Sequence, residues 1–196
     1  MIRPNRNLLA LMLFACLSIP AVVSAQGQPD PAKLMNAQRD AMAVLAKMDG
    51  QWRGPAWTIL PNGEKHSIIQ TERIGSLLDG TIKLVEGRGY EPDGRTGFNA
   101  FAVISFNPAT RSYSLRSHAM GRYGEYLLKP TDDGYTWEIP AGPAMTIRYT
   151  ASIKDGVLRE VGDRLMAGKE PVRFFEMTLT RLGDSPWPAS GAVAPK

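Results

Sequence analysis

Apolar and polar residues alternate along most of this chain with the two-residue period of a β-strand that has one buried face. Between residues 145 and 154, Met145, Ile147 and Tyr149 fall on one side of such a strand. Turn signals rich in Gly, Asn, Asp and Pro interrupt the pattern nine times at nearly even intervals. The pattern predicts ten strands, at 51–60, 65–77, 81–90, 97–106, 112–120, 123–130, 135–140, 144–153, 157–167 and 171–182.

Ten strands joined by short turns form an antiparallel meander, and an open meander leaves two edges free to aggregate. Closing the sheet on itself removes both edges, so the predicted fold is all-β, a roughly ten-stranded antiparallel up-and-down barrel. The fourth strand is apolar on both faces, because Phe101 and Val103 oppose Phe98 and Ala100. We expect something to cover its outer face, and the N-terminal helix is one candidate.

A helical period precedes the strands. Between residues 32 and 48 apolar residues recur every three or four positions, as at Leu34, Ala41 and Leu45, which predicts an amphipathic N-terminal helix. An Asp-Pro pair suits its start, and Gly50 is expected to end it. The helix carries few basic residues, so we expect it to pack over the end of the sheet rather than on a membrane surface.

The segment from Asp49 to Gly54 joins this helix to the first strand. Gly50 lets the backbone turn sharply, and the indole of Trp52 can plug the barrel floor. In a closed barrel the last strand pairs with the first, so Arg181 is expected near Trp52, where a guanidinium over an indole contributes about 0.5–2 kcal/mol. We predict a structural role in barrel closure for these residues, with any ligand site toward the other end.

The first 25 residues have the features of a secretory signal peptide. Arg3 and Arg6 precede an apolar run of about a dozen residues, which is followed by a small-residue cleavage site at Val23-Ser24-Ala25. The run is too short to span ~30 Å of hydrocarbon. Cys16 leaves a lipoprotein alternative open, although Phe14 is bulkier than the usual residue of such signals. We expect an exported protein, periplasmic or secreted, with no integral membrane segment after cleavage.

The remaining organisation follows from these elements. Residues 26–31 are expected to be a polar spacer, residues 32–48 the helix, residues 49–183 the barrel domain and residues 184–196 a disordered tail. The only cysteine of the chain lies in the leader, so the mature fold needs no disulfide and depends on its core.

Charge excludes one class of partner. The 196 residues include 23 Lys and Arg against 19 Asp and Glu, and the two signs are interspersed without long runs of either. Loss of the two leader arginines would reduce the formal net charge of +4 by two. We therefore expect no nucleic-acid partner.

The sequence contains no recognisable reaction motif. It lacks a Gly-x-Ser-x-Gly elbow, a His-Glu-x-x-His pair and a Cys-x-x-Cys pair. His66 and His118 are far apart and have no cluster of ligand-type residues around them, so we expect surface or wall histidines rather than metal ligands. No catalytic residue, metal or cofactor is predicted, and we do not expect an enzyme.

Charged residues inside the predicted strands are the candidates for ligand binding. The charged residues inside the strands are Glu72, Glu86, Arg88, Arg116, Glu125, Arg148, Glu160 and Glu176. Most of them are expected to face solvent, because successive side chains of a strand point to opposite faces. Glu72, Glu86 and Arg88 share strand faces with isoleucine or leucine. A buried charge must be paired or it costs several kcal/mol, so an interior position for these three would mark an ion pair or a ligand anchor. With Tyr149 they are the predicted ligand-lining residues.

Short motifs resemble a known group of barrels. They are the opening Gly50-x-Trp52-x-Gly54, aromatic Phe106 before the turn Asn107-Pro108-Ala109-Thr110-Arg111, and the closing Glu176-Met177 with Arg181. They resemble the calycin group, which includes lipocalins and fatty-acid-binding proteins, and more closely the DUF1579 family of secreted, lipocalin-like barrels. The resemblance covers about residues 45–182. It implies the fold and at most a binding cavity, because that family has no established activity.

The opening motif is also similar to that of nitrobindins, which are ten-stranded haem barrels. Their haem ligand is a histidine near the C-terminus, and this chain has no histidine after His118. The departure argues against haem.

These observations favour a barrel that binds a small apolar or amphipathic ligand in its cavity. One alternative is a protein-interaction or envelope-scaffold module with a packed core and no ligand, for which the doubly apolar fourth strand argues. Another is an enzyme that uses an interior Glu–Arg pair. The identity of the ligand, the inward strand faces and the oligomeric state stay open at this stage.

Overall fold

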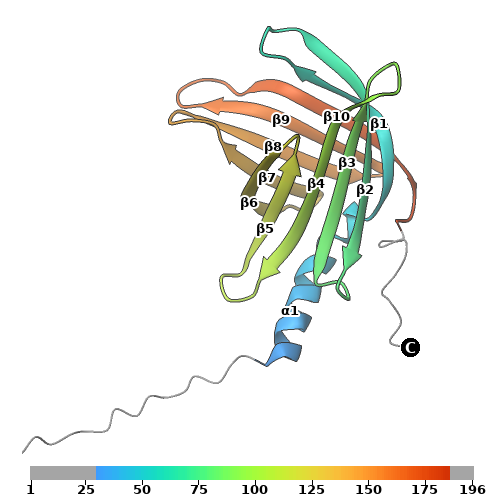
Figure 1. The fold of residues 1–196 in the computed structure, drawn as a ribbon. Coiled ribbons are helices and arrows are strands. Elements are labelled where there is room, and N and C mark those ends of the chain that lie inside the picture. The colour runs from blue at the N-terminus through green and yellow to red at the C-terminus, as the bar shows by residue number, and fades with distance from the viewer. Residues whose placement is uncertain (1–29, 186–196) are drawn as a thin grey trace, which may run out of the picture.

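One α-helix and ten strands form the described part of the chain, residues 30–185 of a computed structural model (Figure 1). The helix α1 spans Pro31–Ala43, and a 3-10 helix follows at Ala46–Met48. The strands are β1 (Gly50–Ile59), β2 (Lys65–Leu77), β3 (Ile82–Tyr90), β4 (Thr96–Asn107), β5 (Ser112–Ala119), β6 (Arg122–Pro130), β7 (Gly134–Pro140), β8 (Met145–Lys154), β9 (Val157–Met166) and β10 (Val172–Gly183). The predicted signal peptide, and most of the predicted spacer and tail, lie outside the described residues.

The strands form a closed barrel. Each one pairs antiparallel with its neighbours in the chain, and β10 pairs with β1. The predicted fold class is therefore confirmed, and no strand boundary differs from the prediction by more than one residue. Register across the closure places Trp52 of β1 opposite Arg181 of β10 on one side and opposite Glu72 of β2 on the other.

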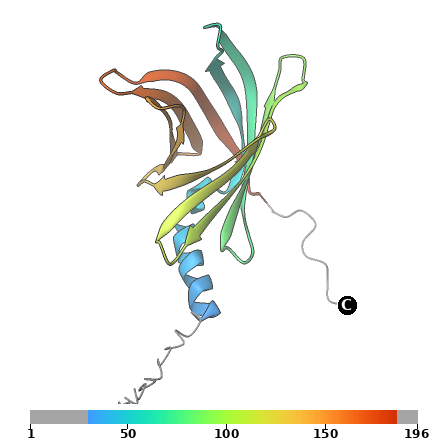
Figure 2. The ribbon, with the colours of Figure 1, turned by 60° about the vertical axis from the view of Figure 1, so that its left-hand side comes forward.

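One seam of the barrel is short. The pairing of β6 with β7 covers only three residue pairs, from Leu128 with Trp137 to Pro130 with Tyr135. All three pairs lie near the turn that joins the two strands, and beyond them β6 pairs with β5 and β7 pairs with β8. The two strands diverge toward the end of the barrel that lies away from α1, where the hairpins spread apart (Figure 2).

The helix begins where the sequence predicts it but ends earlier. The carboxylate of Asp30 accepts a hydrogen bond of 3.0 Å from the amide of Ala32 and caps the first turn. The amides of Val44 and Leu45 donate to carbonyls three residues back, so the α-helix stops at Ala43 and the chain tightens into 3-10 geometry. This turn brings Leu45 and Met48 into the barrel, where both are buried.

Gly50 opens β1 rather than ending the helix. Its φ of +145° lies in a region that side chains disfavour. A Cβ at this position would lie only 2.9 Å from Nε of Arg181 and 3.0 Å from the carbonyl oxygen of Gly183. Glycine is therefore required by the close approach of the first and last strands.

Only the C-terminal end of α1 contributes to the core. Ala41 and Met42 are buried, whereas Leu34 and Met35 nearer the start are 36% and 37% exposed. The helix lies below one end of the barrel, which we call the helix end (Figure 1). It reaches β4 near Phe106, whose carbonyl accepts a hydrogen bond from the helix. The helix therefore packs over the end of the barrel, as predicted, and it is not the cover for the outer face of β4 for which it was one candidate.

A cluster of buried side chains seals the helix end. Trp52 is 1% exposed, and its Nε1 donates a hydrogen bond of 2.9 Å to the carbonyl of Met48. The side chains packed in the same core include Leu45, Ile74, Leu158 and Leu179. The indole is therefore the floor of the barrel, with its one polar atom satisfied.

Polar contacts at Asp49 tie three elements together at this floor. The ammonium of Lys83 in β3 is buried and donates to the carboxylate of Asp49, with Oγ of Ser76 at 3.5 Å. The guanidinium of Arg181 donates to the Asp49 carbonyl at 3.3–3.4 Å and to the carboxylate of Asp184 at 2.5 Å. Arg181 thus lies opposite Trp52 in the register of β1 and β10, and its guanidinium donates to oxygen acceptors of Asp49 and Asp184.

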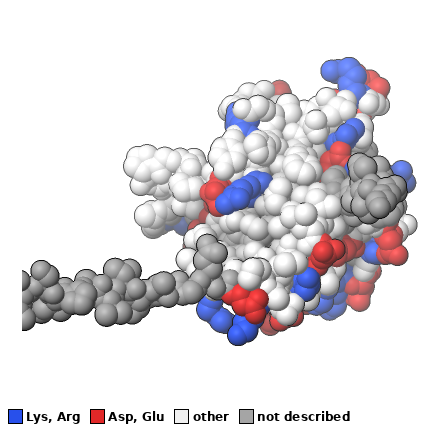
Figure 3. Space-filling model, turned by 60° about the horizontal axis from the view of Figure 1, so that its bottom comes forward, with Lys and Arg blue, Asp and Glu red and all other residues white. Residues whose placement is uncertain are grey.

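The outer surface mixes the two signs of charge. Seen from below, Lys and Arg side chains lie next to Asp and Glu side chains at several places on the face that is shown (Figure 3). Several of these neighbours are exposed ion pairs between strands, such as Arg148 with Glu138. Among the described residues, the one α-helix is neither long nor apolar enough to cross a membrane.

The Lys83–Asp49 pair gives a first testable prediction. Asp49→Asn removes the counter-ion of a buried ammonium, and we expect the free energy of unfolding to fall by about 3 kcal/mol. Urea denaturation measures the loss. The matched control is Glu138→Gln, which breaks an exposed pair and should cost less than about 1 kcal/mol. Equal effects of the two substitutions would contradict the role of the pair in holding the floor.

Candidate functional site

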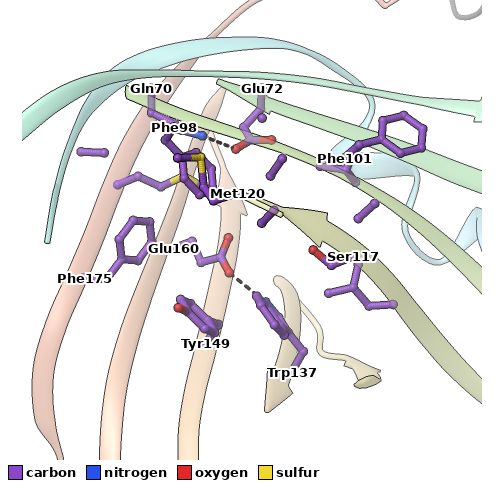
Figure 4. A pocket seen from close by; sticks show the side chains of 18 of the residues that line it. Gln70, Glu72, Phe98, Phe101, Ser117, Met120, Trp137, Tyr149, Glu160 and Phe175 are labelled. Atoms are coloured by element: carbon purple, nitrogen blue, oxygen red, sulfur yellow. Dashed lines mark hydrogen bonds between the residues drawn. The ribbon is translucent and has the colours of Figure 1, made fainter. Parts of the chain in front are cut away.

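The barrel holds a cavity of about 510 Å³ above its floor. Its lining begins at buried Met48, Ile74 and Leu158 and extends to Met120 and Phe174 near the hairpin turns away from α1 (Figure 4). The volume falls within the range of roughly 300–1,000 Å³ that is typical of small-molecule sites. We call the end of the cavity away from α1 its mouth.

Aromatic rings from four strands form one wall of the cavity. Trp137 of β7 and Tyr149 of β8 stack with centroids 4.3 Å apart and an interplanar angle of 10°. Tyr126 of β6 tilts against Trp137 at 5.3 Å, and Phe174 and Phe175 of β10 meet Tyr149 at 6.1 Å and 5.8 Å. We call these five rings the aromatic wall. It presents ring faces and edges that suit an apolar or cationic guest.

The aromatic wall packs over a glycine, Gly162. Gly162 of β9 lies opposite Tyr149 in the register of the two strands. A Cβ at this position would lie 3.0 Å from a ring carbon of Tyr149 and 3.1 Å from Cβ of Phe175. The missing side chain therefore lets the rings pack over β9.

Glu72 points into the cavity from β2. Its Oε1 accepts a hydrogen bond of 2.7 Å from Nε2 of Gln70, which lies two residues earlier on the same face (Figure 4). Gly87 of β3 lies opposite, and a Cβ there would approach Oε1 of Glu72 to 2.8 Å. Burial raises the pKa of Glu72 to about 8, and the charges of Glu160 and Glu86 add to this effect while the Gln70 hydrogen bond opposes it.

Glu160 enters the same cavity from β9 and is only 7% exposed. Its Oε1 accepts a hydrogen bond of 2.9 Å from Nε1 of Trp137, and its Oε2 lies 3.5 Å from the hydroxyl of Tyr135. Burial raises the pKa of Glu160 to about 7, although both hydrogen bonds favour the charged form. Burial also raises the pKa values of Tyr135 and Tyr149 above the ordinary range, so both phenols stay neutral.

The structure separates the predicted ligand-lining residues. Glu72 and Tyr149 line the cavity. Glu86 and Arg88 lie on the outer face of β3, where Nη2 of Arg88 is 2.7 Å from Glu86 and Nη2 of Arg73 is 3.2 Å from Glu86. The prediction of an interior Glu–Arg pair is therefore wrong, because Gly87 between them occupies the inward position of the strand.

Sequence reasoning missed the inward position of Glu160 and overlooked Trp137. Glu160 shares its strand face with Leu158, which was the available signal. The alternation of β9 is weak, however, because Val161 on the opposite face is also buried. Period alone could not decide which face of this strand turns inward.

The two histidines lie away from the deep part of the cavity. His66 lines the mouth, where its Nε2 is 3.2 Å from Oε1 of Glu91. His118 packs against Tyr123 with ring centroids 5.0 Å apart. Within residues 30–185 no group of three or more His, Cys, Asp or Glu side chains is placed to hold a metal ion.

The architecture is that of a closed ten-stranded antiparallel barrel with an interior cavity. The barrel is similar to one known from the crystal structure of Rv2717c from M. tuberculosis, with a TM-score of 0.54 and 12% sequence identity. The match covers 72% of this chain and 96% of that chain, and at this identity it shows the fold alone. No protein-family model matches the chain. No curated protein matches its sequence either.

The two buried carboxyls give a prediction about pH. In the unfolded chain both ionise near pH 4.5. In the folded protein the pKa is about 7 for Glu160 and about 8 for Glu72. The folded state therefore binds more protons than the unfolded state within this window, and stability falls as pH rises through it. Between about pH 5 and about pH 8 the wild type should lose roughly 6 kcal/mol of stability through these two groups, and the double variant Glu72→Gln with Glu160→Gln should not show this loss.

Thermal and urea unfolding across this range measure the difference. Glu138→Gln serves as the control, because it removes an exposed carboxylate of the outer wall and should keep the slope of the wild type. A double variant whose stability changes with pH as steeply as that of the wild type would contradict the assignment of the two buried protons.

Proposed function

We propose that this protein is a binding protein that holds a small amphipathic or apolar molecule in the barrel cavity. The observation that carries the proposal is the cavity of about 510 Å³ above a sealed floor. Small-molecule sites in barrels have this size, with mainly apolar walls and a few polar groups placed among them. The aromatic wall supplies the apolar surface, and Glu72, Glu160 and Gln70 supply the polar groups.

The geometry supports entry of the ligand away from the helix. Trp52 and Met48 are buried at the floor, and α1 covers that end of the barrel. The cavity extends toward the mouth, where β6 and β7 diverge after three residue pairs. A ligand that enters there meets the aromatic wall first and the buried carboxyls deeper in the cavity.

We further propose that the protein is exported, and that binding rather than catalysis is its role. The basic, apolar and small-residue regions of residues 1–25 support export. The resemblance of the Gly50-x-Trp52-x-Gly54 opening to the DUF1579 barrels supports membership of that family, together with the calycin-like architecture. We expect no nucleic-acid partner, because both signs of charge are mixed over the surface.

Filling the cavity tests the proposal. Ala100 of β4 lines the cavity, and the neighbouring Asn99 on the opposite strand face is exposed. We expect Ala100→Trp to occupy the ligand volume and abolish binding, whereas Asn99→Trp adds the same ring outside and preserves binding. Purified proteins are extracted with organic solvent, and mass spectrometry compares the molecules that each releases.

A molecule recovered from the wild type and from Asn99→Trp, but not from Ala100→Trp, is the expected result. Thermal unfolding checks that both variants fold. The proposal is wrong if the wild type releases nothing and no amphipathic probe quenches or shifts its tryptophan emission. That result, together with a captured protein partner in cells, would favour the protein-interaction module.

A further inference from the structure

The deep part of the cavity carries two acidic side chains and an aromatic wall. Glu72 and Glu160 point into the same space from β2 and β9, and the charge of Glu160 helps to raise the pKa of Glu72 (Figure 4). Among the described lining residues, the one Lys or Arg is Arg122, at the start of β6 and next to the hairpin turn of the mouth. The charge of the deep cavity is therefore negative whenever either carboxyl is ionised.

The carboxyl oxygens have acceptor capacity left over. Oε1 of Glu72 accepts one hydrogen bond, of 2.7 Å, from Nε2 of Gln70. The two oxygens of Glu160 receive one hydrogen bond each, from Trp137 and Tyr135. An ionised carboxylate has about four acceptor positions, so both groups can receive further donors from a guest.

We propose that the ligand of this cavity is an organic cation, with its ammonium head between Glu72 and Glu160 and its apolar body along the aromatic wall. The inference rests on the proposed binding function and names the chemical class of the ligand. A cation supplies the positive charge that the two carboxylates lack in the protein itself. The faces of Trp137 and Tyr149 attract the same head, because an aromatic face carries negative electrostatic potential.

Other charged groups around the cavity are already engaged or lie toward the mouth. The ammonium of Lys83 is held by Asp49 below the floor. The guanidinium of Arg164 lies 4.7 Å from the ring centroid of Phe174. Glu86 acts on Glu72 from the outer face of the wall. The remaining titratable or charged side chains that face the cavity are His66, Glu91, Arg122, Tyr123, Tyr126, Tyr135 and Tyr149.

The charge state of the two carboxyls decides whether the affinity for a guest rises or falls with pH. In the empty protein burial raises the pKa of both groups, so each is partly protonated near neutral pH. A cation binds best when both are ionised, so its affinity should rise with pH and its binding should release protons. A neutral guest that accepts a hydrogen bond from a protonated carboxyl should show the opposite dependence. The direction of the pH effect therefore separates the two kinds of guest.

Three probes with one alkyl chain test the inference on the full mature protein. Octylammonium is cationic and carries N–H donors, octanol is neutral, and octanoate is anionic over the same range. Isothermal titration and tryptophan emission measure their affinities between about pH 6 and about pH 9. We expect the cation to bind at least roughly tenfold more tightly than octanol at the upper pH, and this preference to shrink as the carboxyls take up protons. Titration in buffers of different ionisation enthalpy should show proton release.

Substitutions assign the effect to the two carboxyls. Glu160→Gln and Glu72→Gln keep the size of each side chain and remove its charge, so each should lower the affinity for the cation roughly tenfold and leave the affinity for octanol nearly unchanged. Glu138→Gln, on the outer face next to Trp137, should bind all three probes as the wild type does. Urea unfolding verifies that each variant is folded, and the pH series on the wild type tests the inference even where a variant is not.

The outcomes separate the inference from the proposed function. If octanol or octanoate binds as tightly as octylammonium at every pH, the cavity binds ligands but the cationic class is wrong. A preference for the cation that persists in both Gln variants would likewise overturn the placement of its head. If none of the probes binds and no molecule is extracted, the proposed binding function fails together with the inference.

Discussion

The closure of β1 against β10 is the constraint on which the rest of the structure depends. It requires glycine at residue 50, since Arg181 and Gly183 approach the backbone too closely for a side chain. The same junction carries the buried Lys83–Asp49 pair and the hydrogen bond from Trp52 to Met48. A floor sealed by an indole and a buried ion pair gives one end of the barrel no room for a guest. The cavity therefore has to lie between this floor and the hairpins at the far end.

The interior above the floor combines features that oppose stability. Glu160 is buried and Glu72 is half-buried in the cavity wall, and glycines at 87 and 162 leave the room that Glu72 and the aromatic wall occupy. A core selected only for stability would fill such space with apolar groups, because burial of polar groups carries a free-energy cost. Cavities and raised pKa values of this kind concentrate at functional sites, where they reduce stability in return for binding or chemistry. This contrast is why the cavity, and not the floor, is assigned the function.

The strands could be predicted from the sequence because their signals are local. Period-two alternation and turn residues fixed every strand boundary to within one residue. The residue at which α1 stops could not be predicted from the sequence. The 3-10 turn at residues 46–48 depends on the burial of Leu45 and Met48 inside a barrel that closes far along the chain. The inward face of β3 was also hidden, because its inward positions include Gly87 and Gly89. With no side chain there, the face of Glu86 and Arg88 looked more apolar than it is. A similar ambiguity in β9 concealed Glu160.

The charged side chains of the cavity differ between its mouth and its depth, and this difference couples ligand binding to the stability of the fold. The mouth carries Arg122 and the His66–Glu91 pair, whereas the depth carries Glu72 and Glu160. The cost of ionising the two deep carboxyls is paid by the folded state alone, so it weakens the fold as pH rises. A guest that neutralises them removes this cost only while it is bound. Its binding free energy therefore adds directly to the stability of the barrel. A ligand that is cationic at one end would stabilise the fold most under the conditions in which the empty barrel is weakest.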